Sequence, residues 1–180
     1  DMPVSFEVLS DTAEGMEKEA RVIHSWGKNV YVKIPVITPS GESMGGLIKK
    51  LSAGGIPLNV TCVFTPEQAK TAAKSLARDV PSIVSVYAGR IADVGVDPLP
   101  LVRECRDILG ALPKAELLWA STREVYNIWQ AAECGCEIIT APLAMVAKLK
   151  NAGKDLTELS RDAVAAFMRD IASTGVAFSI

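Results

Sequence analysis

Short β-rich runs alternate with helical segments along the whole chain, and this alternation constrains the fold more than any other feature. The segments between the runs have helical periodicity, a pattern typical of β-α units built on a parallel sheet. The sequence therefore predicts an α/β fold. Six runs have strand character: Val4–Val8, Val30–Ile34, Leu58–Phe64, Ile83–Tyr87, Leu117–Ala120 and Ile138–Ala141.

Start and stop signals mark the helices between these runs. Thr65 can cap a helix, Pro66 suits the first helical position, and Gln68 closes a capping box. Gly54-Gly55 and Gly135 stand where helices should end before the next strand. Asp93 and Asp97 are expected in a solvated loop. The other predicted helices are Glu14–Trp26, Ser43–Ala53, Leu99–Leu112, Glu124–Cys134, Leu143–Asn151 and Leu156–Ser173.

Six β-α units leave two architectures open. A closed (β/α)8 barrel, or TIM barrel, has eight strands and usually about 250 residues, with about 200 as a lower bound. This chain has 180. It forms either an open doubly wound sheet or a barrel whose first two β-α units are missing. We favour the barrel because Val4–Val8 is already strand-like without a lead-in. We expect one barrel domain over residues 1–180, including a C-terminal helix from about residue 156.

Composition excludes several classes of function. With 49% hydrophobic and 22% charged residues, the chain can bury a core and is not a disordered protein. A formal net charge of −2 provides no broad basic surface for nucleic acid. No stretch approaches the roughly 20 apolar residues that span a bilayer, and the N-terminus lacks the pattern of a signal peptide. We expect a cytoplasmic protein that binds neither nucleic acid nor membrane.

The cysteines and the single histidine argue against metal and triad chemistry. Cys134 and Cys136 form a C-x-C pair with no second pair or nearby histidine to complete a tetrahedral site. His24 by itself cannot build a histidine-rich zinc site. We therefore expect no metal and no cofactor.

One lysine stands inside a run that should be buried on both faces. Lys33 lies in Val30–Pro35, and burial lowers the pKa of an amine, which makes it a nucleophile toward carbonyl groups near neutral pH. The alternative is a lysine at a strand end that reaches solvent.

Neighbouring runs also carry polar residues late in their length, which favours the nucleophile. Such groups are hard to bury unless they converge on one cavity, and β-α barrels keep their active sites at the corresponding end. The set comprises a carboxylate, amide and hydroxyl groups that can hold a polyol, and two arginines suited to a phosphate. It indicates an imine-forming enzyme acting on a phosphorylated sugar. Its members besides Lys33 are Glu7, Asn59, Thr61, Ser85, Tyr87, Arg90, Ser121 and Arg123.

Four segments in order resemble the transaldolase and fructose 6-phosphate aldolase family. They are Val30–Pro35 (VYVKIP), Gly55–Thr61 (GIPLNVT), Val84–Ile91 (VSVYAGRI) and Ala120–Arg123 (ASTR). The resemblance implies a (β/α)8 barrel and a metal-independent Schiff-base lysine. It also implies transfer or cleavage of a dihydroxyacetone unit in carbohydrate metabolism, as in the pentose phosphate pathway. In relatives of this size the C-terminal helix packs on neighbouring subunits, so a homo-oligomer is implied as well.

The resemblance also assigns roles. Lys33 matches the imine-forming lysine, and Glu7 matches the glutamate that transaldolases use, through a water, for proton transfer. Thr61 is similar to the threonine that orients this water, and Asn59 to the asparagine that holds the dihydroxyacetone hydroxyls. The sugar-phosphate cradle corresponds to Arg90, Ser121 and Arg123.

Two departures leave the subtype open. Tyr87 stands where transaldolases usually carry phenylalanine and the aldolases a catalytic tyrosine, whereas the aldolases tend to have glutamine in place of Glu7. The family's first-strand aspartate and its Thr-Thr-Asn-Pro turn are missing from this sequence. The alternatives are a fructose 6-phosphate aldolase-type lyase, a non-catalytic sugar-phosphate-binding relative, and another imine-forming aldolase.

Overall fold

A computed structural model describes residues 2–175, and the chain divides into two compact units, residues 1–142 and 143–180. A parallel sheet with strand order β1-β2-β3-β4-β5-β6 organises the first unit. Each strand pairs with the next one in the sequence, so the sheet winds in one direction. The doubly wound alternative, in which the order reverses within the sheet, is therefore wrong. The strands are β1 (Val4–Glu7), β2 (Val30–Pro35), β3 (Leu58–Val63), β4 (Ser82–Val86), β5 (Ala115–Trp119) and β6 (Ile138–Ile139).

Helices follow the strands largely as predicted. The capping box of Thr65 and Gln68 is present at the start of α3. Asp97, expected in a solvated loop, instead caps α5 by accepting a hydrogen bond of 3.0 Å from the Leu99 amide. A short helix directly after β4 was not predicted. The helices are α1 (Ala13–His24), α2 (Gly45–Ala53), α3 (Pro66–Ser75), α4 (Ala88–Asp93), α5 (Pro98–Leu109) and α6 (Asn127–Glu133).

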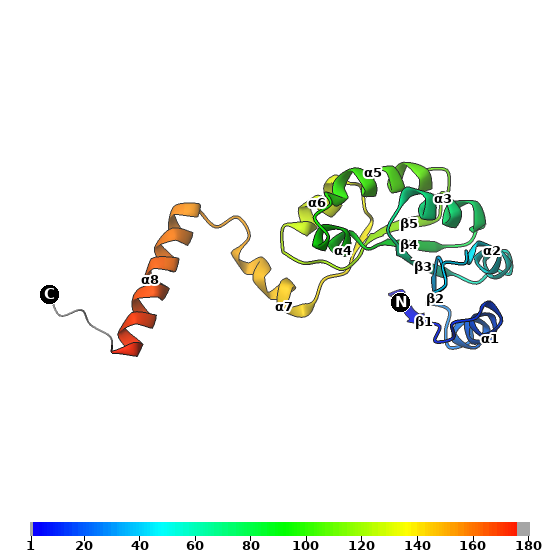
Figure 1. The fold of residues 1–180 in the computed structure, drawn as a ribbon, viewed down its shortest axis with the longest axis horizontal. Coiled ribbons are helices and arrows are strands. Elements are labelled where there is room, and N and C mark those ends of the chain that lie inside the picture. Colours follow the sequence, from blue (N-terminus) through cyan, green and yellow to red (C-terminus); the bar gives the residue numbers. More distant parts are fainter. Residues whose placement is uncertain (1, 176–180) are drawn as a thin grey trace. The chain divides into compact units, whose positions relative to one another are not determined.

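The helices cover one face of the sheet, as α3 and α5 show most clearly (Figure 1). In β2, Val32 and Ile34 are fully buried on the helix side, whereas Tyr31 and Lys33 are only partly buried on the other. The main core lies between sheet and helices. Such a one-sided, sequentially ordered parallel sheet is a half-barrel, which corresponds to part of a TIM barrel. Its helix-free face is the one that can form a site.

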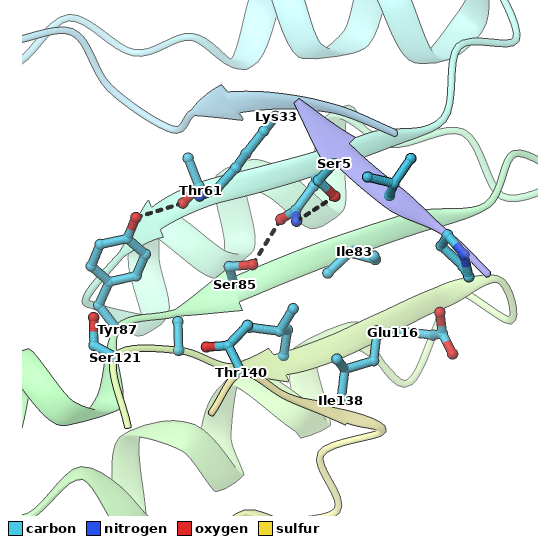
Figure 2. A pocket seen from close by; sticks show the side chains of 15 residues that line it. Ser5, Lys33, Thr61, Ile83, Ser85, Tyr87, Glu116, Ser121, Ile138 and Thr140 are labelled. Atoms are coloured by element: carbon cyan, nitrogen blue, oxygen red, sulfur yellow. Dashed lines mark hydrogen bonds between the residues drawn. The ribbon is translucent and has the colours of Figure 1, made fainter. Parts of the chain in front are cut away.

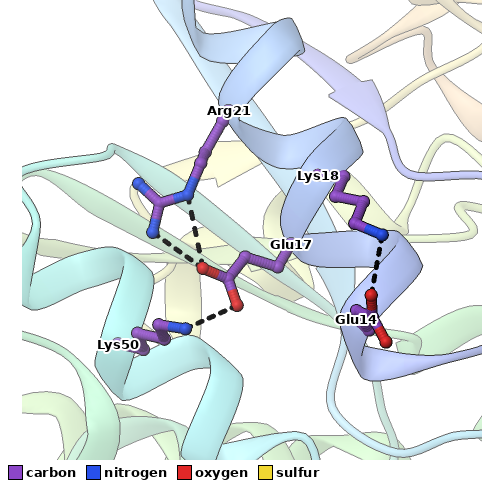
Figure 3. Close-up of polar contacts among 5 residues, drawn as sticks. All are labelled: Glu14, Glu17, Lys18, Arg21 and Lys50. Atoms are coloured by element: carbon purple, nitrogen blue, oxygen red, sulfur yellow. Dashed lines mark hydrogen bonds and ion pairs between the residues drawn. The ribbon is translucent and has the colours of Figure 1, made fainter.

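Helices α1 and α2 are joined by an ion-pair network on the outer surface. Glu17 accepts hydrogen bonds from Lys50 on α2 and from Arg21 one turn further along α1, at 2.7 and 2.8 Å (Figure 3). The hydrogen bond from Lys50, followed by that from Arg21, lowers the pKa of the Glu17 carboxyl. This network fixes the first two helices beside each other.

The second unit contains α7 (Leu143–Val146), a 3₁₀ helix (Ala147–Asn151) and α8 (Leu156–Thr174). Asp155 caps α8 by accepting hydrogen bonds from the amides of Thr157 and Glu158. The predicted C-terminal helix is confirmed to within one residue at its end. Large apolar side chains along it, such as Phe167 and Met168, are exposed. In the described part of the chain, no helix has the length and apolar character needed to cross a membrane.

Candidate active site

A cavity of about 760 Å³ lies on the helix-free face of the sheet (Figure 2). Successive side chains of a strand alternate between faces, so residues two apart share this face. The register places Lys33 opposite Asn59, and Ser85 opposite Leu118. The half-barrel thus brings six of the nine predicted site residues to one cavity: Lys33, Asn59, Thr61, Ser85, Tyr87 and Ser121.

Lys33 and Glu7 form an ion pair at the edge of this cavity. Lys33 Nζ lies 3.4 Å from Glu7 Oε2, because the two residues are register partners on β2 and β1. The Lys33 side chain is 29% exposed and that of Glu7 is 45% exposed. The lysine is therefore not sealed from water, in contrast to the buried position that its strand pattern indicated. It is partly shielded, and it has a carboxylate within reach for proton exchange.

Asn59 is held by serines on both sides. Ser85 Oγ donates a hydrogen bond of 2.7 Å to Asn59 Oδ1, and Asn59 Nδ2 donates one of 3.1 Å to Ser5 Oγ (Figure 2). These two bonds determine which end of the amide faces each serine. Asn59 and Ser85 are both buried, so the network presents a fixed array of polar groups at the cavity wall.

Thr61 and Tyr87 meet across the same wall. Thr61 Oγ1 donates a hydrogen bond of 2.9 Å to Tyr87 Oη. The register of β3 and β4 shifts between Val60 and Val63, and Cys62 there has a positive φ of 58°. A bulge of this kind often re-aims side chains beside functional sites. Here it follows directly after Thr61.

The two predicted phosphate-binding arginines flank the cavity instead of lining it. The Arg90 guanidinium lies 5.1 Å from the centre of the Tyr87 ring, in a cation–π contact. Arg123 forms an ion pair with Asp93, in which Nε donates at 3.0 Å to each carboxylate oxygen and Nη2 donates at 2.5 Å. This pairing lowers the pKa of Asp93 and raises that of Arg123.

Three residues of this region were missed or misassigned by sequence reasoning. Asp93 was expected in a solvated loop. Ser5 lies two residues before Glu7, so period-two spacing could have identified it. Glu116 lines the cavity at the end away from Tyr87 (Figure 2). Burial raises the pKa of Tyr31, and the charge of Glu116 raises it further.

Among residues 2–175, no group of three or more His, Cys, Asp or Glu side chains is arranged to hold a metal ion.

Fold and site define a half-barrel α/β protein with a polar cavity that a lysine lines, and sequence comparison then identifies its family. The family model of transaldolase/fructose-6-phosphate aldolase matches residues 1–178. Proteins described as probable transaldolases are similar to this chain. The one from Nitrosopumilus maritimus is 40% identical over 81% of this chain and 63% of its own, and that from Methanococcus maripaludis strain C5 is 38% identical over 94% and 74%. The chain belongs to the transaldolase/fructose-6-phosphate aldolase family.

Two further comparisons concern length and fold. The chain spans just under two thirds of the probable transaldolases of N. maritimus and Thermoplasma volcanium, 63% and 62% respectively. A crystal structure of orotidine 5'-phosphate decarboxylase from Lactobacillus acidophilus matches with a TM-score of 0.51 at 19% identity, over 86% of this chain and 78% of that one. At this identity the likeness concerns the fold alone, and it supports the barrel-type architecture.

Proposed function

We propose that this protein is a metal-independent, transaldolase-like Schiff-base enzyme that cleaves a ketose phosphate and transfers its dihydroxyacetone unit. The observation that carries the proposal is the Lys33–Glu7 pair, 3.4 Å apart at a cavity that polar side chains line. A lysine amine and a carboxylate in contact supply a nucleophile and a proton carrier. Family membership supports the same reaction class.

In the proposed reaction the Lys33 ammonium passes a proton to Glu7, and the neutral amine adds to the ketone carbon of the sugar. Glu7 returns the proton as water leaves, which gives a protonated imine. The bond between the third and fourth carbons then breaks, and its electron pair moves toward the imine nitrogen to form an enamine. The proton of the fourth-carbon hydroxyl passes through a water to Glu7, and an aldehyde leaves. Attack of the enamine on an acceptor aldehyde reverses these steps, and hydrolysis of the new imine frees Lys33.

The remaining cavity residues bind and orient the sugar in this proposal. Asn59 and Ser85 hold the hydroxyls of the dihydroxyacetone unit, and Thr61 orients the water that carries the proton. Arg90, Ser121 and Arg123 bind the phosphate, since guanidinium groups suit bidentate contact with phosphate oxygens. Phosphate-binding energy then orients the reacting carbons.

A fructose 6-phosphate aldolase-type lyase is the second candidate, and Tyr87 favours it. Tyr87 lines the cavity and its hydroxyl accepts the hydrogen bond from Thr61, so a second proton carrier lies at the same cavity as Lys33. Protonation of the enamine and hydrolysis of the imine would then release free dihydroxyacetone. The two activities differ in the fate of one intermediate.

Borohydride trapping tests the proposed nucleophile. The chain is incubated with fructose 6-phosphate and borohydride, and intact mass followed by peptide mapping locates any reduced adduct. We expect an adduct on Lys33 that Lys33→Met abolishes. Lys70→Met, which removes an exposed lysine paired with Glu67 and Glu104, is the matched control and should leave trapping unchanged. Undiminished trapping in Lys33→Met would contradict the assignment, and no adduct in the unmodified chain would favour a non-catalytic sugar-phosphate-binding relative.

We further propose that the six strands are part of an eight-stranded barrel in the complete protein. The coverage of the relatives supports this. So does Phe6 of β1, which is 41% exposed although its register partner Val32 is buried on the helix side. Intact mass of the protein isolated from its native source tests this directly. Additional sequence forming two β-α units is expected, and a mass equal to that of these 180 residues would refute it.

Assembly and location are further proposals. The exposed apolar side chains of α8 support a homo-oligomer, which light scattering would detect as a mass above that of one chain. A light-scattering mass of one chain would contradict it. Cytoplasmic location and a role in the pentose phosphate pathway also remain predictions, and so does the absence of nucleic-acid and membrane partners.

A further inference from the structure

Asp93 occupies one edge of the Arg123 guanidinium and leaves another edge free. Nε and Nη2 of Arg123 donate to the two carboxylate oxygens of Asp93. A guanidinium is planar and carries five N–H donors in a rigid fork, so a carboxylate on the Nε–Nη2 edge leaves the Nη1–Nη2 edge available. In the described part of the chain, Arg123 Nη1 forms no hydrogen bond. A second anion can therefore bind without displacing Asp93.

Asp93 and Arg123 lie on parts of the chain that pack closely together, because Asp93 ends α4 and Arg123 follows β5. A Cβ on Gly89 of α4 would lie 1.6 Å from the Ser121 carbonyl oxygen and 3.2 Å from Arg123 Cγ, so only glycine permits this approach. The backbone amide of Arg123 donates to Asn127 Oδ1 at 2.8 Å. Arg123 is thus held at its backbone and along its stem, and Asp93 determines the direction of the guanidinium.

Arg123 lines a small cavity at the ends of β5 and β6, and Ser121 and Thr140 line both this cavity and the Lys33 cavity. Arg123, whose guanidinium has the free edge, therefore lies at a cavity that adjoins the candidate active site. With Arg90 close enough to Asp93 to contribute to its low pKa, the cluster contains two cations and one anion. Its net positive charge suits a phosphate.

We propose that Asp93 is a positioning residue, which orients Arg123 so that the arginine presents its free edge to the phosphate of the substrate. The proposal rests on the phosphate-binding role that the proposed function gives Arg123. Without Asp93 a half-exposed arginine side chain samples many rotamers, and that freedom is lost whenever phosphate binds. Removal of the carboxylate should therefore weaken phosphate binding even though it removes a negative charge.

Calorimetric titration with inorganic phosphate tests this without requiring catalysis. We expect Asp93→Ala to raise the dissociation constant for phosphate about tenfold, and Asp93→Asn, which keeps one acceptor oxygen, to raise it less. In an Arg123→Ala background, Asp93→Ala should change the dissociation constant for phosphate less than twofold. The control Glu133→Gln removes the carboxylate of a comparably exposed pair, Arg103–Glu133, and should have no effect.

Trapping of dihydroxyacetone on Lys33 with borohydride separates this proposal from the proposed function, because dihydroxyacetone has no phosphate. The concentration for half-maximal trapping should be unchanged in Asp93→Ala. A parallel rise in that concentration would mean a general structural defect and would overturn the positioning role. Unchanged or tighter phosphate binding by Asp93→Ala would also overturn the positioning role. The same holds if Asp93→Ala has equal effects with and without Arg123, or if the unmodified chain binds no phosphate. If the unmodified chain traps no dihydroxyacetone, the proposed function fails, while the phosphate titrations still decide the role of Asp93.

Discussion

The Thr61 hydroxyl donates a hydrogen bond of 2.9 Å to the Tyr87 hydroxyl, across strand β3 and the end of β4. Both residues line the cavity that contains Lys33. The contact joins the residue assigned to water orientation with the residue that distinguishes the two candidate activities. The two proposed activities can therefore be distinguished by removing one oxygen atom, the Tyr87 hydroxyl.

We expect Tyr87→Phe to suppress release of free dihydroxyacetone from fructose 6-phosphate by about a hundredfold, while transfer to an acceptor aldehyde is retained. Loss of the hydroxyl removes the proton carrier that protonates the enamine, a step that only release requires, but leaves Lys33 and Glu7 in place. Coupled assays of free dihydroxyacetone and of transfer product measure the ratio of release to transfer. Tyr126→Phe, at an exposed tyrosine outside the cavity, is the control. Equal release by Tyr87→Phe and the unmodified chain would exclude an acid–base role for Tyr87.

Ser85→Ala should destabilise the fold by about 1–3 kcal/mol, because it leaves the buried Asn59 Oδ1 without its donor. Urea unfolding measures the change. Ser82→Ala is a matched control on the same strand, since both serines are 2% exposed and the Ser82 hydroxyl forms no hydrogen bond within residues 2–175. The interpretation fails if both substitutions have the same effect.

Gly89→Ala should destabilise the protein by about 1–3 kcal/mol and weaken phosphate binding. The added Cβ would lie 1.6 Å from the Ser121 carbonyl oxygen, so the start of α4 must move away from the end of β5. Gly46→Ala in α2, where no atom lies within 4 Å of a new Cβ, should instead stabilise by about 0.4–1 kcal/mol. Unfolding midpoints compare the two, and a neutral Gly89→Ala would show that the contact is loose.

Stability should fall as pH rises above about 9. Burial raises the pKa of the Cys105 thiol from its ordinary value of 9.0 to about 12, and it raises the pKa of the Cys136 thiol to about 12 as well. Below pH 9 both thiols are neutral in the folded and unfolded states, so they add no pH dependence. Between pH 9 and 12 the unfolded chain ionises first, which favours unfolding.

Urea midpoints at pH 7.5 and 10 measure this loss. Cys105→Ala should be less stable at both pH values because it leaves a cavity, yet it should lose less on going to pH 10. An equal loss in the variant and the unmodified chain would assign the alkaline effect to other groups.

Much of the fold follows from local pattern. The six strands, the capped start of α3 and the helix at residues 156–174 are all encoded by neighbouring residues whose period and cap chemistry identify them. The short helix α4 was missed because its apolar residues follow those of β4 without a break. Asp97 was misassigned because an aspartate before a proline fits a loop as well as a helix cap.

The sequence by itself determined which side chains share a face of each strand, because alternation along a strand is a local property. It thereby identified Lys33, Asn59, Thr61, Ser85 and Tyr87 as a group. Only the tertiary structure decided that the sheet winds in one direction and that Glu7 contacts Lys33. Strand order and register depend on contacts between residues distant in the chain.

The same reason explains why the partners of the two arginines could not be predicted from the sequence. Sequence spacing indicated Arg90 and Arg123 as phosphate ligands but could not supply their partners. Asp93 and Arg123 lie 30 residues apart, and they meet because α4 packs on the end of β5 through Gly89. Which carboxylate holds an arginine depends on how helices and strands pack, and no local pattern encodes that packing.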